Sequence, residues 1–187
     1  MEGAHGGHVE GGDKRTALVI AVLALFLAIV ETGAKSAQTQ AITLNVEATN
    51  LWAFFQARTI RQTTATAAVE SAELQKLATT DAAIRTGIEA QQKAWRDQVA
   101  NWESNDKNDG RKELSARARE TETRRERYMA QYHFYEYAAA LLQVAIVIAS
   151  ATIITSTPWL ILVSLAMAAG GVALSAVGFL APGLFHL

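Results

Sequence analysis

The segments AAALLQVAIVIASATIITST (138–157) and WLILVSLAMAAGGVALSAVGFL (159–180) decide the fold of this 187-residue chain. Neither segment contains a charged residue. Because an α-helix rises about 1.5 Å per residue, about 20 apolar residues are enough to cross a hydrocarbon core of about 30 Å. Pro158 interrupts a helix between the two segments, and Trp159 suits the boundary between lipid and water. We therefore expect a transmembrane hairpin.

A third apolar segment, 16–34, follows the basic pair Lys14 and Arg15. A basic pair before a short apolar run also describes a secretory signal peptide. No convincing small-x-small cleavage site follows the run, so we predict an uncleaved transmembrane helix. The expected fold class is an all-α membrane protein with three transmembrane helices and a long helical-hairpin, coiled-coil-like insert between the first and the second.

The insert, residues 35–137, has a strongly helical composition, with one glycine and no proline from 36 to 103. Heptad spacing relates Leu74, Leu77, Ile84, Ile88, Trp95 and Trp102. After the polar segment NDKNDG (105–110), spacings of four and three relate Leu114, Ala118, Thr121, Arg125, Tyr128, Tyr132 and Tyr135. Two such stripes joined by a short polar turn predict an antiparallel helical hairpin with its turn near 105–110.

Helix lengths leave one part of the insert without a partner in this prediction. A return helix over 111–137 needs an outgoing helix only over about 78–105, since both would span about 40 Å. Residues 36–77 remain. We expect this segment to bend, to lie along the membrane or to pack against neighbouring subunits.

The unpartnered segment carries an aromatic cluster, LWAFF (51–55), followed by Arg58 and Arg61. Aromatic rings beside arginine suit the lipid headgroup region, and an ordinary helix-packing core is the alternative. Tyrosines precede the second apolar segment and a tryptophan opens the third, as in an aromatic belt. The predicted membrane-interface or subunit-contact residues are Trp52, Phe54, Phe55, Arg58, Arg61, Tyr135, Tyr137 and Trp159.

The segment NLWAFFQARTIR (50–61) is similar to the signature W-x-[FY]-[FY]-Q-A-K-S-I-[KR] of a bacterial membrane family catalogued as domain of unknown function 4337. The order of parts resembles that family along the whole chain. Members commonly carry lysines in the hairpin turn, so the resemblance implies a bacterial inner-membrane protein with a cytoplasmic N-terminus and an extracytoplasmic insert. Lys14 and Arg15 support this orientation, whereas the arginines at 119–127 favour the opposite one. The family name implies no activity.

Few residues offer chemistry. The chain has no cysteine and a net charge of −1, which excludes thiol chemistry and gives no basic excess for nucleic acid. His5 and His8 lie in a glycine-rich segment that we expect to be a flexible tail, residues 1–15. His133 and His186, the latter in a short C-terminal tail over 181–187, have no evident carboxylate partner. We predict no catalytic, cofactor-binding or metal-binding residue.

Small residues recur in the third apolar segment at Ala166, Gly170, Gly171, Ser175 and Gly178. Such spacing lets helices approach closely, either within the hairpin or between subunits. We therefore expect a non-enzymatic, homo-oligomeric membrane protein that serves as an assembly or docking scaffold, with the lipid bilayer, copies of itself and another membrane protein as partners. The alternative is an oligomeric channel for ions or small solutes, lined by Gln143, Thr152 and Thr155.

Overall fold

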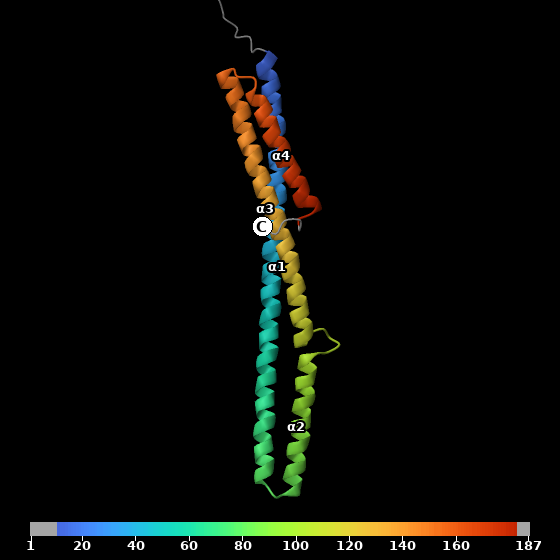
Figure 1. Ribbon diagram of the computed structural model, residues 1–187. Coiled ribbons are helices and arrows are strands. Elements are labelled where there is room, and N and C mark those ends of the chain that lie inside the picture. Colours follow the sequence, from blue (N-terminus) through green and yellow to red (C-terminus); the bar gives the residue numbers. More distant parts are fainter. Residues whose placement is uncertain (1–10, 183–187) are drawn as a thin grey trace, which may run out of the picture. The chain divides into compact units, whose positions relative to one another are not determined.

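A computed structural model describes residues 11–182, and this part of the chain folds into four α-helices (Figure 1). Helix α1 is Gly11–Ala78, α2 is Ala82–Glu103, α3 is Arg111–Thr155 and α4 is Leu160–Leu180. No residue from 11 to 182 belongs to a β-strand, which confirms the all-α class. Helices α1, α3 and α4 are each long and apolar enough to cross a membrane, as the three apolar segments predict.

The chain divides into two compact units. The first unit contains the described residues up to Ala41 together with those from Glu126 onward, and the second unit is Ile42–Arg125. Helix α1 therefore contributes its first part to one unit and its remainder to the other, and α3 does the same.

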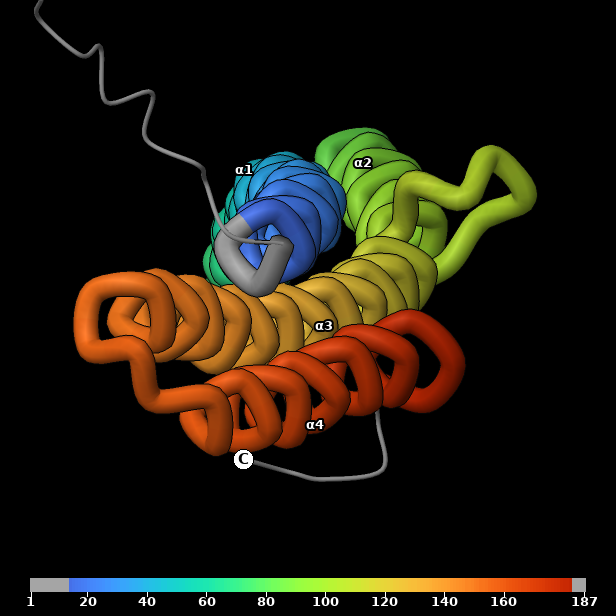
Figure 2. Tube along the Cα trace, turned by 90° about the horizontal axis from the view of Figure 1, so that it is seen from above, coloured from blue at the N-terminus to red at the C-terminus, as the bar shows by residue number. Residues whose placement is uncertain are grey.

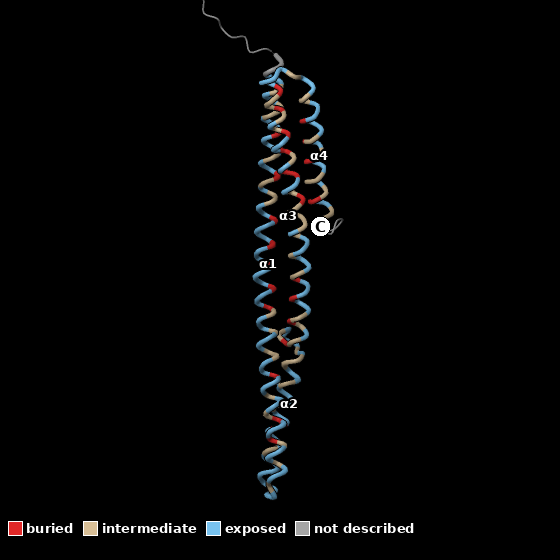
Figure 3. The backbone as a smooth tube through the Cα atoms, turned by 60° about the vertical axis from the view of Figure 1, so that its left-hand side comes forward, coloured by how far each residue is buried: buried red, intermediate tan, exposed pale blue. Residues whose placement is uncertain are grey.

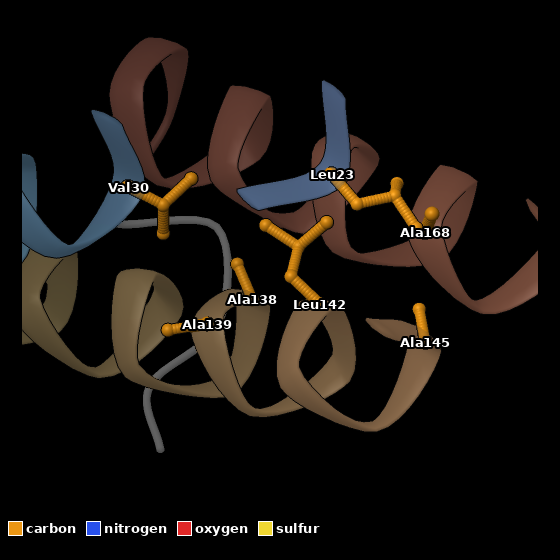
Figure 4. Packing of buried hydrophobic residues seen from close by; sticks show 7 residues of the cluster. All are labelled: Leu23, Val30, Ala138, Ala139, Leu142, Ala145 and Ala168. Carbon is orange, nitrogen blue, oxygen red and sulfur yellow. The ribbon is translucent and has the colours of Figure 1, made fainter. Parts of the chain in front are cut away.

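The first unit is built around a core shared by α1, α3 and α4 (Figure 4). Leu142 of α3 is fully buried in this core, which also contains Leu23 of α1 and Ala168 of α4. Helix α4 lies alongside α3 (Figure 2). The Ser164 hydroxyl is buried and donates a hydrogen bond to the Ala145 carbonyl at 2.7 Å, which ties the two helices together.

The break between α3 and α4 falls where the proline predicts it. Helix α3 ends at Thr155 and α4 begins at Leu160. Ser156 adopts a φ of 53°, in the left-handed region, which ends the helix before Pro158. The hairpin form of these two helices therefore follows from a local signal.

In the second unit α1 packs against both α2 and the start of α3. Its buried positions recur at intervals of three, four, seven and eleven and so lie on one face, as Figure 3 shows for the buried residues. Gln92 of α2 donates a hydrogen bond to the Val69 carbonyl at 2.9 Å. Leu51 forms a core with Leu114 and Ala118 of α3.

The structure corrects the predicted position of the chain reversal. The chain turns at 79–81, where the Asp81 carboxylate accepts hydrogen bonds from the backbone N–H groups of Ala83 at 2.8 Å and Ile84 at 3.3 Å. Because this N-cap begins a new helix at Ala82, no continuous helix runs from α1 into α2. Residues 104–110 do form a loop, as predicted, but the helices on both sides of that loop pack against α1.

The prediction that residues 36–77 lack a partner in the chain is therefore wrong. These residues belong to α1, and from Ile42 onward they contact α2 and α3 of the same chain. The predicted pairing of 78–105 with 111–137 is also wrong. The heptad assignment ran through the Asp81 cap, and Leu74, Leu77 and Ile84 of that assignment are exposed. The stripe from Leu114 through Thr121 is buried as expected, against a different helix.

Parts of the predicted tails lie outside the described residues: 1–10, with His5 and His8, and 183–187, with His186. Residues 11–15, predicted to be part of a flexible tail, belong to α1.

Candidate functional site

The segment 50–61 lies on α1 within the second unit, and its residues divide between two faces. Leu51 is buried, while Trp52, Phe55 and Arg58 are half-buried on the same side. Phe54 is 63% exposed, and Arg61 is also exposed. The predicted contact residues of this segment therefore do not form one surface.

The rings of Trp52 and Phe55 are engaged within the chain. Trp52 Nε1 donates a hydrogen bond to Glu122 Oε1 at 2.9 Å. The two rings meet edge to face, with centroids 5.4 Å apart, and the Arg111 guanidinium lies 5.1 Å from the Phe55 ring centre. Of the two interpretations of the aromatic cluster, helix packing accounts for these two side chains.

A polar cluster surrounds the loop between α2 and α3. We call Arg58, Gln62, Glu103, Asp109 and Arg111 the junction cluster. The Arg58 guanidinium forms an ion pair with Asp109 at 2.6 Å and donates a second bond to the Asp109 carbonyl at 3.1 Å. Gln62 donates to Glu103 at 3.1 Å and accepts from Arg111 at 2.9 Å. These contacts fix the loop against α1.

Gly110 and Ser104 let the loop close tightly. A Cβ at Gly110 would lie 2.7 Å from the Ser104 Cα, a distance that real Cβ atoms do not tolerate, so a side chain does not fit there. The Ser104 hydroxyl donates a hydrogen bond to the Glu113 carboxylate, which holds the pKa of that carboxyl below its ordinary value. The loop is therefore held in a defined conformation by residues outside Asn105–Gly110, the segment that the sequence predicts to be a polar turn.

Beside the junction cluster lies a groove of about 460 Å³ within the second unit. Its apolar residues are Leu51, Phe54, Ala57 and Leu114, and its charged residues are Arg58, Arg61, Arg117 and Asp109. Three arginines against one carboxylate give the groove a cationic rim around an apolar surface. The groove brings together three of the predicted contact residues, Phe54, Arg58 and Arg61, of which Phe54 and Arg61 remain exposed.

In the first unit two of the predicted small residues bring α3 and α4 into close contact. A Cβ at Gly178 would lie 2.6 Å from the Phe134 Cβ, and one at Gly171 would lie 3.0 Å from the Ala138 carbonyl oxygen. Gly170 has ordinary clearance, with its nearest such atom 3.7 Å away. Gly171 and Gly178 therefore pack within the hairpin, which was one of the two open alternatives.

The remaining predicted packing and interface residues occupy varied positions. Ala166 is exposed, and the Ser175 hydroxyl donates to the Val172 carbonyl of its own helix at 2.8 Å. Tyr135 packs against the core of the first unit, whereas Tyr137 and Trp159 are exposed, at 50% and 60%.

The polar residues considered for a channel lining do not share an environment. Thr152 is buried, whereas Gln143 and Thr155 are exposed. Gln143 donates a hydrogen bond to the Glu31 carboxylate of α1 at 3.3 Å. The sequence alone does not predict this pair, because it depends on how α1 meets α3.

The side chains at 14–182 hold no group of three or more histidine, aspartate or glutamate residues arranged to bind a metal ion. Contrary to the prediction, His133 has a carboxylate partner, since its Nδ1 lies 3.6 Å from Glu136 Oε2. The spacing of three residues on one helix would have identified this pair.

We expect the second unit to lose stability in acid partly through Glu73. Hydrogen bonds from Lys76 at 3.0 Å and from Gln92 at 3.1 Å lower the pKa of Glu73 below its ordinary value of 4.5. Because the folded carboxyl binds a proton less readily than the unfolded one, its stabilisation is present above pH 4.5 and is lost as pH falls through the folded pKa. Glu73→Gln should flatten the pH dependence of thermal unfolding below pH 4.5. Glu70→Gln, an exposed control on the same helix, should leave that dependence unchanged, and an equal effect of both variants would contradict the assignment.

Comparison with known proteins finds one family. The sequence pattern of the family described as domain of unknown function (DUF4337) matches residues 12–181. The comparisons with curated proteins and with solved structures returned no match.

Proposed function

This chain belongs to the family described as domain of unknown function (DUF4337), and from its own structure we propose that it is a non-enzymatic, homo-oligomeric membrane protein serving as an assembly or docking scaffold. The match covers most of the chain, so the architecture described above is that of a family member. The family description assigns no activity, but the surfaces of the two units support this proposal.

One observation carries the proposal: the second unit completes its internal packing and still exposes large apolar side chains. These are Ile42, Val46, Phe54, Ile60, Leu74, Leu77 and Ile84. All but Ile84 lie on α1, which has already buried another face against α2 and α3. Apolar surface left over after internal packing favours a further protein contact.

The first unit supports a membrane location. Its three helices expose large apolar side chains around the shared core, among them Leu18, Leu25, Ile29, Val147, Ile154, Leu162 and Phe179. Lipid tails would cover such residues without cost.

We place the chain in the bacterial inner membrane with Lys14 and Arg15 cytoplasmic and residues 42–125 outside. Labelling of an Ala90→Cys variant by a membrane-impermeant maleimide tests this orientation, and labelling only after permeabilisation would reverse it.

Homo-oligomerisation has a direct test. The chain has a mass of 20.2 kDa. We expect the protein extracted in mild detergent to have a protein mass of twice this value or a higher whole-number multiple. Light scattering with detergent correction, or native mass spectrometry, measures it. Because bulk detergent can dissociate weak oligomers, the same measurement in lipid nanodiscs serves as the control. A strictly single-chain mass in both media would refute the proposal.

A further inference from the structure

The outer face of α1 in the second unit carries a regular row of uncharged residues. Val46, Ala53, Ile60, Ala67 and Leu74 follow one another at intervals of seven, and all five are exposed. We call these five residues the outer row. The large members are 55%, 66% and 70% exposed at positions 46, 60 and 74.

The outer row faces away from the internal partners of α1. Ile60 is nine residues from both Leu51 and Val69, which corresponds to about 180° around the helix at 100° per residue. Leu51 and Val69 are buried against α3 and α2. Helix α1 thus has two opposite faces suited to helix packing, and one of them has no partner among the residues of the second unit, Ile42–Arg125.

The size of this face suits a protein interface. Residues 42–78 of α1 extend for about 55 Å, and a helix about 10 Å across therefore presents a projected area of about 550 Å². The accessible area of a corrugated surface exceeds its projection, so the face approaches the roughly 800 Å² per partner of a standard interface.

The chemistry of the row favours an identical helix as its partner. Thr49, Gln56 and Thr63 lie between members of the row, so the seven positions from Val46 to Ala67 with spacings of three and four carry no charge, and Glu70, between Ala67 and Leu74, is the first charged one. Copies inserted in one membrane share an orientation, and a two-fold axis along α1 places each position against itself. Like charges would repel in such an arrangement, and the seven positions from Val46 to Ala67 have none. Ala53 and Ala67 allow the two backbones to come close.

A lipid surface fits less well, because a helix lying on lipid needs lysine or arginine beside its apolar face. The basic residues of α1 in the second unit are Arg58, Arg61 and Lys76. Arg58 is paired with Asp109, and Lys76 with Glu73 and Glu89, which leaves Arg61.

We propose that the outer row is the surface through which a second copy of this chain docks, with the two α1 helices parallel and related by a two-fold axis. This inference rests on the proposed homo-oligomer and adds the contact surface and its symmetry.

Disulfide trapping tests the inference directly, because the chain contains no cysteine of its own. In native membranes under mild oxidation, Ala53→Cys and Ala67→Cys should each form a disulfide-linked dimer, since residues on a two-fold axis bring their Cβ atoms within about 4 Å. Ala90→Cys, an exposed alanine on α2, is the matched control. We expect at least tenfold less dimer from the control.

Charge insertion gives an independent readout. Ile60→Lys places two like charges on the proposed axis and should convert the dimer to single chains, whereas Ala90→Lys, on the exposed surface of α2, should not. Circular dichroism checks that both variants keep their helical content, and the mass in nanodiscs reports the assembly.

The outcomes separate this inference from the proposed function. An oligomeric mass together with no trapping at Ala53 and Ala67, or with equal trapping at Ala90, would overturn the docking surface and leave the homo-oligomer standing. A single-chain mass would overturn both. Quenching by brominated lipids of a fluorophore attached to the thiol of the Ala53→Cys variant would assign the row to the bilayer, and a disulfide adduct with a different mass would assign it to another protein. Either result refutes the second copy.

Discussion

Gly178→Leu is expected to destabilise the packing of α4 against α3 by about 3 kcal/mol or more, the upper end of the range for overpacked cores. The Cβ of any side chain at this position would lie 2.6 Å from the Cβ of Phe134, which is attached directly to the α3 backbone. No rotation of the Phe134 ring moves that atom. The helices must therefore separate, and contacts such as the Ser164 bond to the Ala145 carbonyl should weaken with them.

The control for this variant is Gly170→Leu, at a site in the same helix that lacks the tight contact. The nearest atom to a Cβ at Gly170 is the end of the Leu141 side chain, at 3.7 Å, which is ordinary contact. Thermal unfolding of the two variants in the same detergent compares them. We expect a clear loss of midpoint temperature for Gly178→Leu alone. Equal stability would show that α3 and α4 do not depend on this close approach.

Leu51→Ala is expected to destabilise the second unit by about 2–5 kcal/mol, the range measured when a large buried side chain is truncated. Leu51 is 6% exposed and packs against Leu114 and Ala118, so its removal leaves a cavity between α1 and α3. Ala118 has no exposed surface and too small a side chain to fill that space. The rings of Trp52 and Phe55 border the same core and should become mobile.

Ile84→Ala is the matched control, because it removes a side chain of equal size from an exposed site on α2. Hydrogen exchange of the amides at 111–125 reports opening of the α1–α3 contact in the full-length protein. Leu51→Ala should accelerate this exchange strongly and Ile84→Ala only slightly. If both variants exchange as the parent protein does, the core around Leu51 does not hold the unit together.

The contacts of the second unit explain why its candidate site could be predicted only in part. The segment 50–61 was recognisable from its residue types, since aromatic rings beside arginines are unusual within a helix of small polar residues. Which of those residues point toward α3 was not recognisable, because that depends on the face α1 presents to its partner. Trp52 therefore contacts Glu122, 70 residues away, while Phe54, two residues further along, remains exposed.

The chain reversal illustrates the same limit. A heptad pattern predicts that one face of a helix will be buried. The same pattern fits any partner helix whose apolar residues recur with a similar period. The signal that was overlooked is local: Thr79 and Thr80 precede Asp81, whose side chain caps the next helix. Recognising that cap would have moved the turn from 105–110 to 79–81 and given residues 42–77 their partners.

The sequence by itself determined the helical class, the three apolar segments and the break at Pro158, because length, apolar content and the backbone chemistry of proline act over a few neighbouring residues. The tertiary structure alone decided which faces meet. It paired α1 with α2 and α3, placed Gly171 and Gly178 against α3 rather than at a subunit contact, and left the outer row of α1 exposed. The physical reason is that burial depends on the fit between two surfaces, and a single helix carries the pattern of only one of them.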